Sequence, residues 1–305
     1  MTNIAEPMMV GRVEYGDRAF EQDTHEAMRG DIVRGLIELI TNADDAYARM
    51  GAVVGKIRVE VEHRRGAKWR VIVRDRATGM TQAELITRIT KLAQRVSGFE
   101  SGQAVRGNLG RGAKDVSAFG ATTYESVCDD QYAYLELLSS GAYEAHKKPR
   151  RVTPEDRDRL GIPRGNGTVV TCLVGSRIRC PNHSTLVERL AKHFQLRDIM
   201  SDPKREVLLV NLNSREQERL RYLPPNSTLL RAVELTVPGY RGTTANLEIR
   251  RLSDRCDQTS SDPCRPAGII ITGQRAIYEN TLFSFEQTPY AAFVHGRLDC
   301  PKIDA

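Results

Sequence analysis

Three polar residues stand at helical spacing within one apolar stretch, residues 31–47. Glu38 and Asn42 are four residues apart, and Asn42 and Asp45 are three apart, so a helix would present all three on one stripe. The other positions are mostly apolar, which predicts a largely buried helix whose polar groups need partners. Amide and carboxylate oxygens suit Mg²⁺, and Glu38 could orient or deprotonate a water molecule. A core helix with a capped polar seam is the alternative.

A second candidate site follows the strand expected over residues 69–73. Asp75 stands at the end of this strand and is followed by Ala77 and Gly79. A carboxylate followed by small residues lets the backbone approach a flat ligand closely. Thr81 and Glu84 have the spacing of a capping box, which predicts a short helix. The D-x-A-x-G pattern by itself is common to many turns.

A third candidate is the glycine-rich segment of residues 98–112. It contains Gly98, Gly102, Gly107, Gly110 and Gly112. A long glycine-rich segment between two helices predicts a mobile lid. Its end opens onto a helix, where exposed N–H groups and the helix dipole favour an anion such as phosphate. A flexible loop with no ligand is the alternative.

Alternating strands surround these segments and must position them. Strands are expected over residues 56–62, 69–73, 122–128, 131–139 and 143–146. Residues 147–164 are expected to be a surface excursion, residues 165–173 a glycine turn that leads into a buried strand, and residues 184–199 a helix. From residue 201 the pattern is mostly strands, over 207–212, 231–237, 245–252 and 268–272. We therefore expect one domain over residues 1–200 and a second over 201–305. The last residues lack a helix or capping signal, so a truncated second domain is expected.

The composition is typical of a soluble globular protein. The 305 residues are 40% hydrophobic and 28% charged, and no apolar run is long enough to span a bilayer. The N-terminus lacks the pattern of a signal peptide, so we expect an intracellular location, cytoplasmic or, in a eukaryote, nuclear. The net charge of +6 is compatible with nucleic acid, although a solvated surface is the better explanation of the basic clusters.

The six cysteines contain no C-x-x-C pair. In an intracellular protein we expect them to be free thiols. A zinc site built on Cys256 and Cys264 is the alternative, and their spacing is wider than that of the usual zinc knuckle.

Four short motifs now stand in a fixed order along residues 38–168. They are Glu38-x-x-x-Asn42-Ala43-x-Asp45-Ala46, Asp75-x-Ala77-x-Gly79, Gly107-x-x-Gly110-x-Gly112 and Gly167-Thr168. Their order and spacing resemble the GHKL ATPases, the group of gyrase, the Hsp-ninety chaperones, histidine kinases and MutL. The resemblance implies an α+β protein with the Bergerat fold, a two-layer α/β sandwich that holds ATP between its helices and under a lid, followed here by a β-rich, transducer-like domain.

The resemblance also implies roles for individual residues. Glu38 looks like the general base that activates water, and Asn42 looks like the Mg²⁺ ligand. Asp75 looks like the adenine anchor that accepts a hydrogen bond from the exocyclic amine. Gly79 lets the base lie against the backbone, and Thr168 is similar to the family's threonine beside the adenine.

The phosphate-binding end of the lid is implied in the same way. Gly107, Gly110 and Gly112 look like its glycines, with Lys114 near them. Further positions that the resemblance places at the nucleotide are Asp45, Met80, Arg111 and Ala113. One departure is visible, because the first glycine of the family's D-x-G-x-G is Ala77 here. A methyl group is a small addition, so we expect a tightened pocket rather than a lost one.

The subgroup can be narrowed by two features. Histidine kinases generally lack a glutamate four positions before the asparagine, so Glu38 favours hydrolysis over phosphate transfer. Residues 268–277 are similar to the strand-turn of the transducer domain in MutL, type II topoisomerases and MORC-type ATPases. In those families the transducer supplies a lysine to the γ-phosphate, and Lys302 is the candidate here. A surface lysine is the alternative.

The leading hypothesis is a Mg²⁺-dependent ATPase in a DNA-related process. ATP would order the lid and drive formation of a homodimer, and hydrolysis would reopen it. Two alternatives remain open. One is a chaperone-like ATPase that acts on proteins, and the other is a non-hydrolysing nucleotide-binding scaffold.

Overall fold

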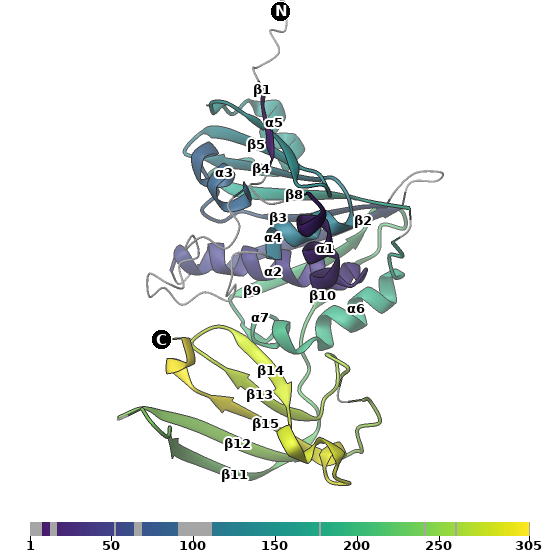
Figure 1. The fold of residues 1–305 in the computed structure, drawn as a ribbon, viewed down its shortest axis with the longest axis vertical. Helices are drawn as coiled ribbons and strands as arrows, with labels where there is room; N and C mark the ends of the chain where they lie inside the picture. Colours follow the sequence, from purple (N-terminus) through teal and green to yellow (C-terminus); the bar gives the residue numbers. More distant parts are fainter. Residues whose placement is uncertain are drawn as a thin grey trace, which may run out of the picture. The chain divides into compact units, whose positions relative to one another are not determined.

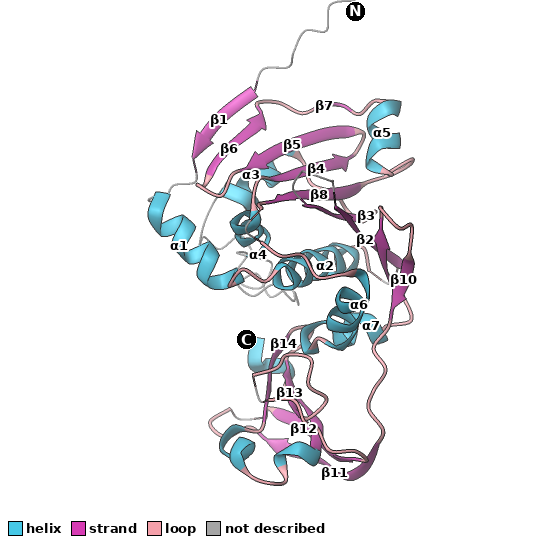
Figure 2. Cartoon of the chain, turned by 90° about the vertical axis from the view of Figure 1, so that its right-hand side faces the viewer, coloured by secondary structure: helices cyan, strands magenta, loops and turns pink. Residues whose placement is uncertain are grey.

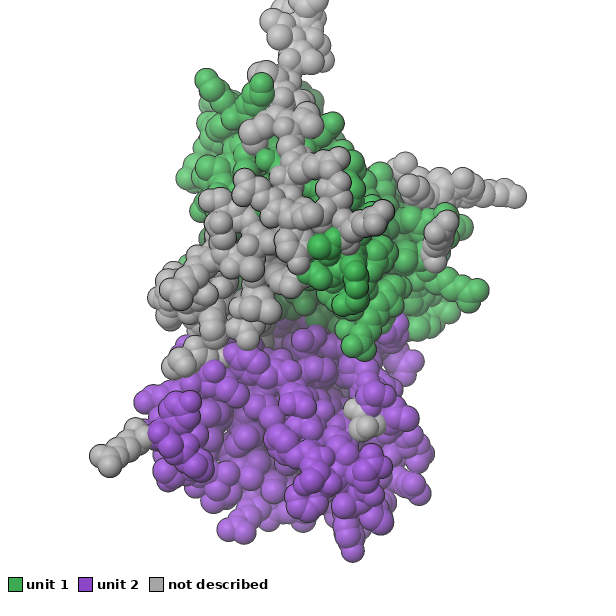
Figure 3. All heavy atoms as spheres, viewed as in Figure 1, with its two compact units in different colours: residues 1–96, 109–187, 202–220 green, residues 97–108, 188–201, 221–305 purple. Residues whose placement is uncertain are grey.

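The computed structural model describes residues 8–12, 17–51, 53–63, 69–90, 112–176, 178–240, 242–259 and 261–304. These residues form two compact units, coloured separately in Figure 3. The first contains the described residues up to 90 together with 112–187 and 202–220. The second contains 188–201 and 221–304.

The first unit is a single large sheet with helices on it (Figures 1 and 2). Its strands are β1 (Met8–Arg12), β2 (Gly55–His63), β3 (Trp69–Asp75), β4 (Thr122–Cys128), β5 (Gln131–Leu137), β6 (Ala142–His146), β7 (Arg150–Arg151), β8 (Gly167–Val174), β9 (Arg205–Asn211) and β10 (Gln217–Leu220). Its helices are α1 (Asp17–Met28), α2 (Ile32–Arg49), α3 (Gln82–Thr90), α4 (Gly112–Asp115), the 3₁₀ turn η2 (Val116–Phe119), α5 (Pro154–Leu160) and α6 (His183–Lys192), whose last five residues belong to the second unit.

The strands of this sheet are ordered β1-β6-β5-β4-β8-β3-β2-β9-β10, with β7 paired to β5. All neighbours are antiparallel except β2 and β9, which are parallel. The central pairing sets Asp75 of β3 opposite Thr168 of β8, and Thr168 opposite Ser126 of β4. Three polar residues from distant parts of the chain therefore lie in one row.

Alternate residues of each strand face opposite sides of the sheet. Tyr124 packs with Phe20 of α1 and Leu85 of α3. Val127, three residues along the same strand, packs with Leu160 at the end of α5. We call these sides the α2 face, to which Tyr124, Ser126, Thr168 and Asp75 point, and the α5 face, to which Val127, Glu125 and Arg74 point.

The central helix α2 forms where the sequence predicts it. Asp31 is its N-cap, and its side chain accepts a hydrogen bond from the N–H of Val33 at 3.2 Å. Gly51, with φ of +83°, follows the C-cap Met50. Twelve of the eighteen residues of α2 are buried. Packing of this apolar surface holds the helix on the sheet, with β2 and β3 among its contacts.

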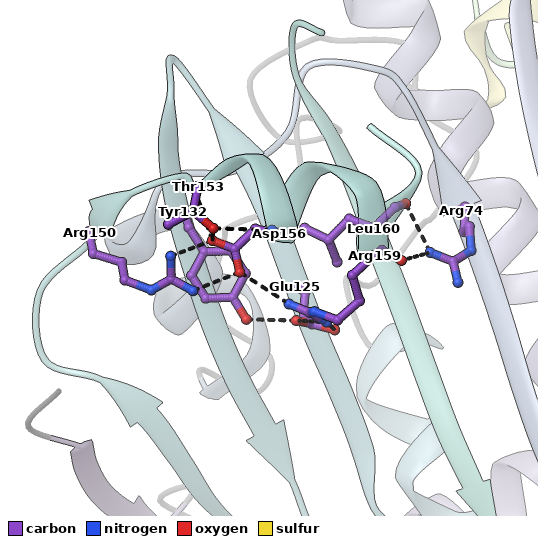
Figure 4. Close-up of polar contacts among 8 residues, drawn as sticks. All are labelled: Arg74, Glu125, Tyr132, Arg150, Thr153, Asp156, Arg159 and Leu160. Atoms are coloured by element: carbon purple, nitrogen blue, oxygen red, sulfur yellow. Dashed lines mark hydrogen bonds and ion pairs between the residues drawn. The ribbon is translucent and has the colours of Figure 1, made fainter. Parts of the chain in front are cut away.

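Residues 147–164, expected to be a surface excursion, contain the helix α5. Thr153 caps it and forms a capping box with Asp156, and Pro154 stands in its first turn. Gly161 ends it with φ of +66°. Figure 4 shows that Arg150 also pairs with Asp156, with Nη2 of Arg150 2.9 Å from Oδ1. The local start and stop signals were present in the sequence, and the charge of the segment obscured them.

The second unit is built on a five-stranded sheet ordered β11-β12-β15-β13-β14. The strands are β11 (Ser227–Thr236), β12 (Thr244–Leu252), β13 (Gly268–Thr272), β14 (Ile277–Thr281) and β15 (Val294–Asp299). The unit also contains α7 (Arg197–Ser201) and the 3₁₀ turns η3 (Phe194–Leu196), η4 (Phe283–Gln287), η5 (Ala291–Phe293) and η6 (Pro301–Asp304). An ion pair between Arg297 and Asp198, 2.6 Å long, ties β15 to α7.

The expected second domain over 201–305 differs from this second unit at its start. Residues 205–220 form β9 and β10, which extend the first sheet because β9 pairs in parallel with β2. The helix expected over 184–199 is also divided into α6, η3 and α7. The alternation of apolar residues predicts that a strand forms. It does not predict which strand it pairs with, because pairing depends on the fold of the whole chain. The assignment of functional domains stays a prediction.

Candidate functional site

The polar stripe of α2 is present, and Glu38 is its first residue. Its side chain is half-buried. Burial, together with the neighbouring carboxylates of Asp115 and Asp45, raises the pKa of Glu38 from its usual 4.5 to about 7. Asp45 is on the same helix, whereas Asp115 ends α4. A carboxyl group that titrates near neutral pH is suited to accept a proton from water.

Gly112, the first residue of α4, lies directly against this carboxylate. A Cβ atom added to Gly112 would be 1.9 Å from Oε2 of Glu38 and 2.4 Å from its Cδ. Any larger residue would therefore displace the Glu38 side chain. The sequence linked these two residues only through their predicted roles, and the fold places them in contact. Gly107, Gly110 and Arg111, which were predicted to bind phosphate, lie outside the described residues.

Asn42, the predicted Mg²⁺ ligand, lies one turn from Glu38 and is half-buried. Among the described residues, its buried Nδ2 atom has no hydrogen-bond partner. This Nδ2 group can donate a hydrogen bond to a ligand oxygen, whereas the side-chain oxygen is the atom that could coordinate Mg²⁺. No group of three or more His, Cys, Asp or Glu in the described part of the chain could hold a metal by itself. Mg²⁺ commonly takes one or two protein ligands and completes its shell with phosphates and water.

Asp75, the predicted adenine anchor, is buried at the end of β3. Its Oδ1 accepts a hydrogen bond from the N–H of Ala77 at 2.9 Å. Burial raises the pKa of Asp75 from 3.8 to about 6, while hydrogen bonds from the backbone of Ala77 and Thr168 act in the opposite direction. The carboxylate keeps acceptor capacity beyond these bonds, which a ligand amine could use. Ala77 itself is only 1% exposed, so its methyl group is packed into the protein.

Gly79 can only be glycine at this position. Its φ is +65°, and a Cβ atom would be 2.2 Å from the carbonyl oxygen of Val127 in β4. The next residue, Met80, donates its N–H to Oγ of Ser126 at 2.7 Å, and Ser126 Oγ donates to the carbonyl of Gly167 at 3.1 Å. The segment after Asp75 is therefore joined to both β4 and β8. Ser126 carries no motif signal, and only its position opposite Thr168 reveals it.

The remaining predicted residues that the structure describes differ in burial. Lys114 is 2% exposed and Ala113 is half-buried, and the Ala113 carbonyl accepts a hydrogen bond from the Tyr124 hydroxyl. Lys302 is exposed in η6 of the second unit. Its role at the γ-phosphate stays a prediction, as do the ligand roles of all these side chains. The six cysteines, each of them described, form no disulfide. The described residues contain no group of three or more His, Cys, Asp or Glu that could hold a metal, so the alternative zinc site at Cys256 and Cys264 gains no support.

One family model matches the chain, over residues 32–137. It describes histidine kinase-, DNA gyrase B- and HSP90-like ATPases. The chain carries a GHKL ATPase domain. The match begins at the first residue of α2 and ends at the last residue of β5, so it contains Glu38, Asn42 and Asp75. Thr168 lies beyond the matched segment, but β8 joins it to the GHKL domain by pairing with β3.

No curated protein matches the chain significantly. The α+β fold agrees with the GHKL assignment, and a β-rich second unit follows it. Within the part of the chain that the structure describes, no helix has the length and apolar character needed to cross a membrane.

Proposed function

We propose that this protein is a Mg²⁺-dependent ATPase whose nucleotide site is the α2 face of the first sheet. The observation that carries the proposal is the arrangement of α2 beside the end of β3. The helix bears Glu38 and Asn42, and Asp75 ends the strand on which α2 packs. Both carboxyl groups are held in surroundings that raise their pKa, a property typical of functional sites.

Each residue has a distinct task in this proposal. Asp75 accepts a hydrogen bond from the exocyclic amine of adenine, and Gly79 allows the base to approach the backbone. Glu38 removes a proton from the attacking water. Asn42 would hold Mg²⁺, which would neutralise charge on the phosphates. Gly112, against Glu38, brings the start of α4 to the place where the terminal phosphate would react.

The finer parts of the proposal concern the consequences of binding. ATP orders residues 98–112 as a lid, and the ordered lid promotes a homodimer, with Lys302 as the candidate γ-phosphate lysine. The protein then acts in a DNA-related process. The resemblance to MutL, topoisomerases and MORC-type ATPases and the net charge of +6 support this reading.

Titration of the whole chain with a non-hydrolysable ATP analogue, with and without Mg²⁺, tests the proposed site. We expect saturable binding that Mg²⁺ strengthens, and phosphate release from ATP under the same conditions. A chain that binds the analogue but releases no phosphate would support the scaffold alternative. Absence of binding at millimolar analogue would refute the nucleotide site.

Light scattering on apo, ADP-bound and analogue-bound samples tests the switch. We expect a monomer without nucleotide and a shift toward the dimer with the analogue only, because ADP lacks the group that would reach the lid. The same mass in all three states would contradict a γ-phosphate-sensing lid. Salt-dependent DNA binding would support the DNA-related role, and its absence at low salt would contradict it.

A further inference from the structure

Tyr47 connects the catalytic helix to the adenine-binding turn, although no motif includes it. It lies near the end of α2, is 3% exposed, and makes two hydrogen bonds to the backbone of other segments. Its hydroxyl donates to the carbonyl of Lys56 in β2 at 2.8 Å. The same hydroxyl accepts a hydrogen bond from the N–H of Arg76 at 2.8 Å. One side chain therefore joins α2, β2 and the residue that follows Asp75.

The Arg76 N–H group donates to a side chain, the Tyr47 hydroxyl, at the start of the turn after β3. The strand β3 ends at Asp75, so Arg76 is the first residue outside it. The next N–H, that of Ala77, is held by the Asp75 carboxylate itself. The Tyr47 hydroxyl thus fixes one end of the turn, and Asp75 depends on that turn for the direction of its remaining acceptor positions.

The Tyr47 ring has no freedom to move away. A Cβ atom on Gly55 would be 2.7 Å from the ring, so the ring lies directly on the start of β2. The Arg205 guanidinium lies 5.5 Å from the ring centroid. Arg205 is itself fixed by a buried ion pair with Asp44, 2.6 Å long. A buried ring held from three elements places its hydroxyl accurately.

We propose that Tyr47 is a positioning residue that sets the orientation of the Asp75 carboxylate and so determines how strongly the site prefers a 6-aminopurine. The inference rests on the proposed function, because it concerns the same site. Loss of the hydroxyl leaves Asp75 in place but frees the Arg76 end of its turn. Recognition of the exocyclic amine then weakens, while contacts to the phosphates are retained.

The test compares ATP with purine riboside triphosphate, which lacks the 6-amino group. We expect Tyr47→Phe to weaken ATP binding about threefold to tenfold, as expected for one neutral hydrogen bond, with the affinity for the analogue unchanged. Tyr132→Phe is the matched control. Its buried hydroxyl donates to Glu125 at 2.6 Å on the α5 face, so its removal should leave the ratio of the two affinities unchanged.

The outcomes separate the two proposals. If the unmodified chain binds neither triphosphate, the proposed function fails. If it prefers ATP and Tyr47→Phe keeps the same preference, the positioning role is overturned. Should Tyr47→Phe not fold, hydrogen exchange of the unmodified chain decides the point. Protection of the Arg76 amide comparable to that within β3 supports the role, and rapid exchange of that amide overturns it.

Discussion

The two faces of the first sheet treat their charged groups in opposite ways. On the α5 face, Asp156 accepts hydrogen bonds from Arg150 and Thr153. The hydrogen bond from Arg150 holds the pKa of Asp156 well below its usual range. Glu125 lies between the Tyr132 hydroxyl and Arg159, at 2.6 and 2.7 Å (Figure 4). On the α2 face, burial raises the pKa of Glu38 and Asp75, and the Nδ2 of Asn42 has no partner among the described residues.

This difference separates a structural network from a candidate site. Charges that are already paired contribute to stability and have little capacity left for a ligand. Carboxylates whose burial outweighs the effect of nearby cations and hydrogen bonds cost stability, and a protein retains them where function requires them. Both faces are formed by the same strands. The contrast between paired and desolvated carboxylates therefore depends on which side of the sheet a residue occupies. The four predictions below test it, from the largest expected effect to the smallest.

The largest effect is expected at Glu38. Glu38→Gln keeps the size of the side chain beside Gly112 and removes the base, so turnover should fall by about 10²–10⁴-fold with nucleotide affinity retained. Phosphate release and analogue titration measure the two quantities. Glu125→Gln, on the α5 face, is the control and should hydrolyse ATP at the original rate per folded molecule. Equal turnover in Glu38→Gln and the unmodified chain would assign the base to another residue.

Asp75→Ala should weaken ATP binding by about 1.5–3 kcal/mol, because it removes a charged acceptor from a buried site. Titration calorimetry measures this change. Thermal unfolding should show that the variant is folded and no less stable than the original chain at pH 8, since the buried carboxylate is removed. An unchanged ATP affinity would contradict the assignment of Asp75 as the adenine anchor.

Asp156→Ala should have the reverse profile. It loses the pair with Arg150 and the capping box of α5, so the free energy of unfolding should fall by about 2 kcal/mol. Its ATP affinity should stay the same. Asp158→Ala on the exposed side of α5 is the control, with an expected change within about 0.5 kcal/mol. Loss of ATP affinity in the folded Asp156→Ala protein would show that the two faces are not separable.

The smallest effect concerns pH. The pKa of Glu38 is raised to about 7 in the folded protein from 4.5 when unfolded, so the folded state holds the proton more tightly. Its contribution to stability is complete below pH 4.5 and is lost as pH rises to about 7. As the pH rises from 5 to 8, the free energy of unfolding of Glu38→Gln should therefore increase by roughly 1–2 kcal/mol relative to that of the original chain, allowing for partial exposure. Urea unfolding of the two proteins at pH 5 and at pH 8 measures this change. The same stability difference at both pH values would contradict a Glu38 carboxylate that is destabilised by burial.

The local elements could be read from the sequence because their signals are local. The apolar surface and Asp31 cap determined α2, and alternation determined the strands from β2 to β6. The capping box of Thr81 and Glu84 is present, with the Thr81 N–H 2.8 Å from Oε2 of Glu84. The α5 helix had an equally local signal in Thr153 and Pro154, and the charge-rich segment around it was interpreted as irregular.

The sequence by itself determined which residues are candidates for chemistry. Glu38, Asn42 and Asp45 share a helical stripe whatever the rest of the chain does, because the period of the helix fixes their spacing. Asp75, at the end of a strand, and Gly79, in the turn after it, are only four positions apart, so their proximity is also local. These motifs led to the GHKL resemblance, and the family match over residues 32–137 agrees with it.

Only the tertiary structure decided how these candidates are held. The hydrogen bond from Arg76 to Tyr47 joins residues 29 positions apart, and that from Met80 to Ser126 spans 46 positions. The contact of Gly112 with Glu38 likewise depends on where α4 lies. None of these contacts has a periodic signal, because each depends on how separate elements pack. The same packing removes water from Glu38 and Asp75, and this desolvation, which spacing along the chain does not encode, raises their pKa values.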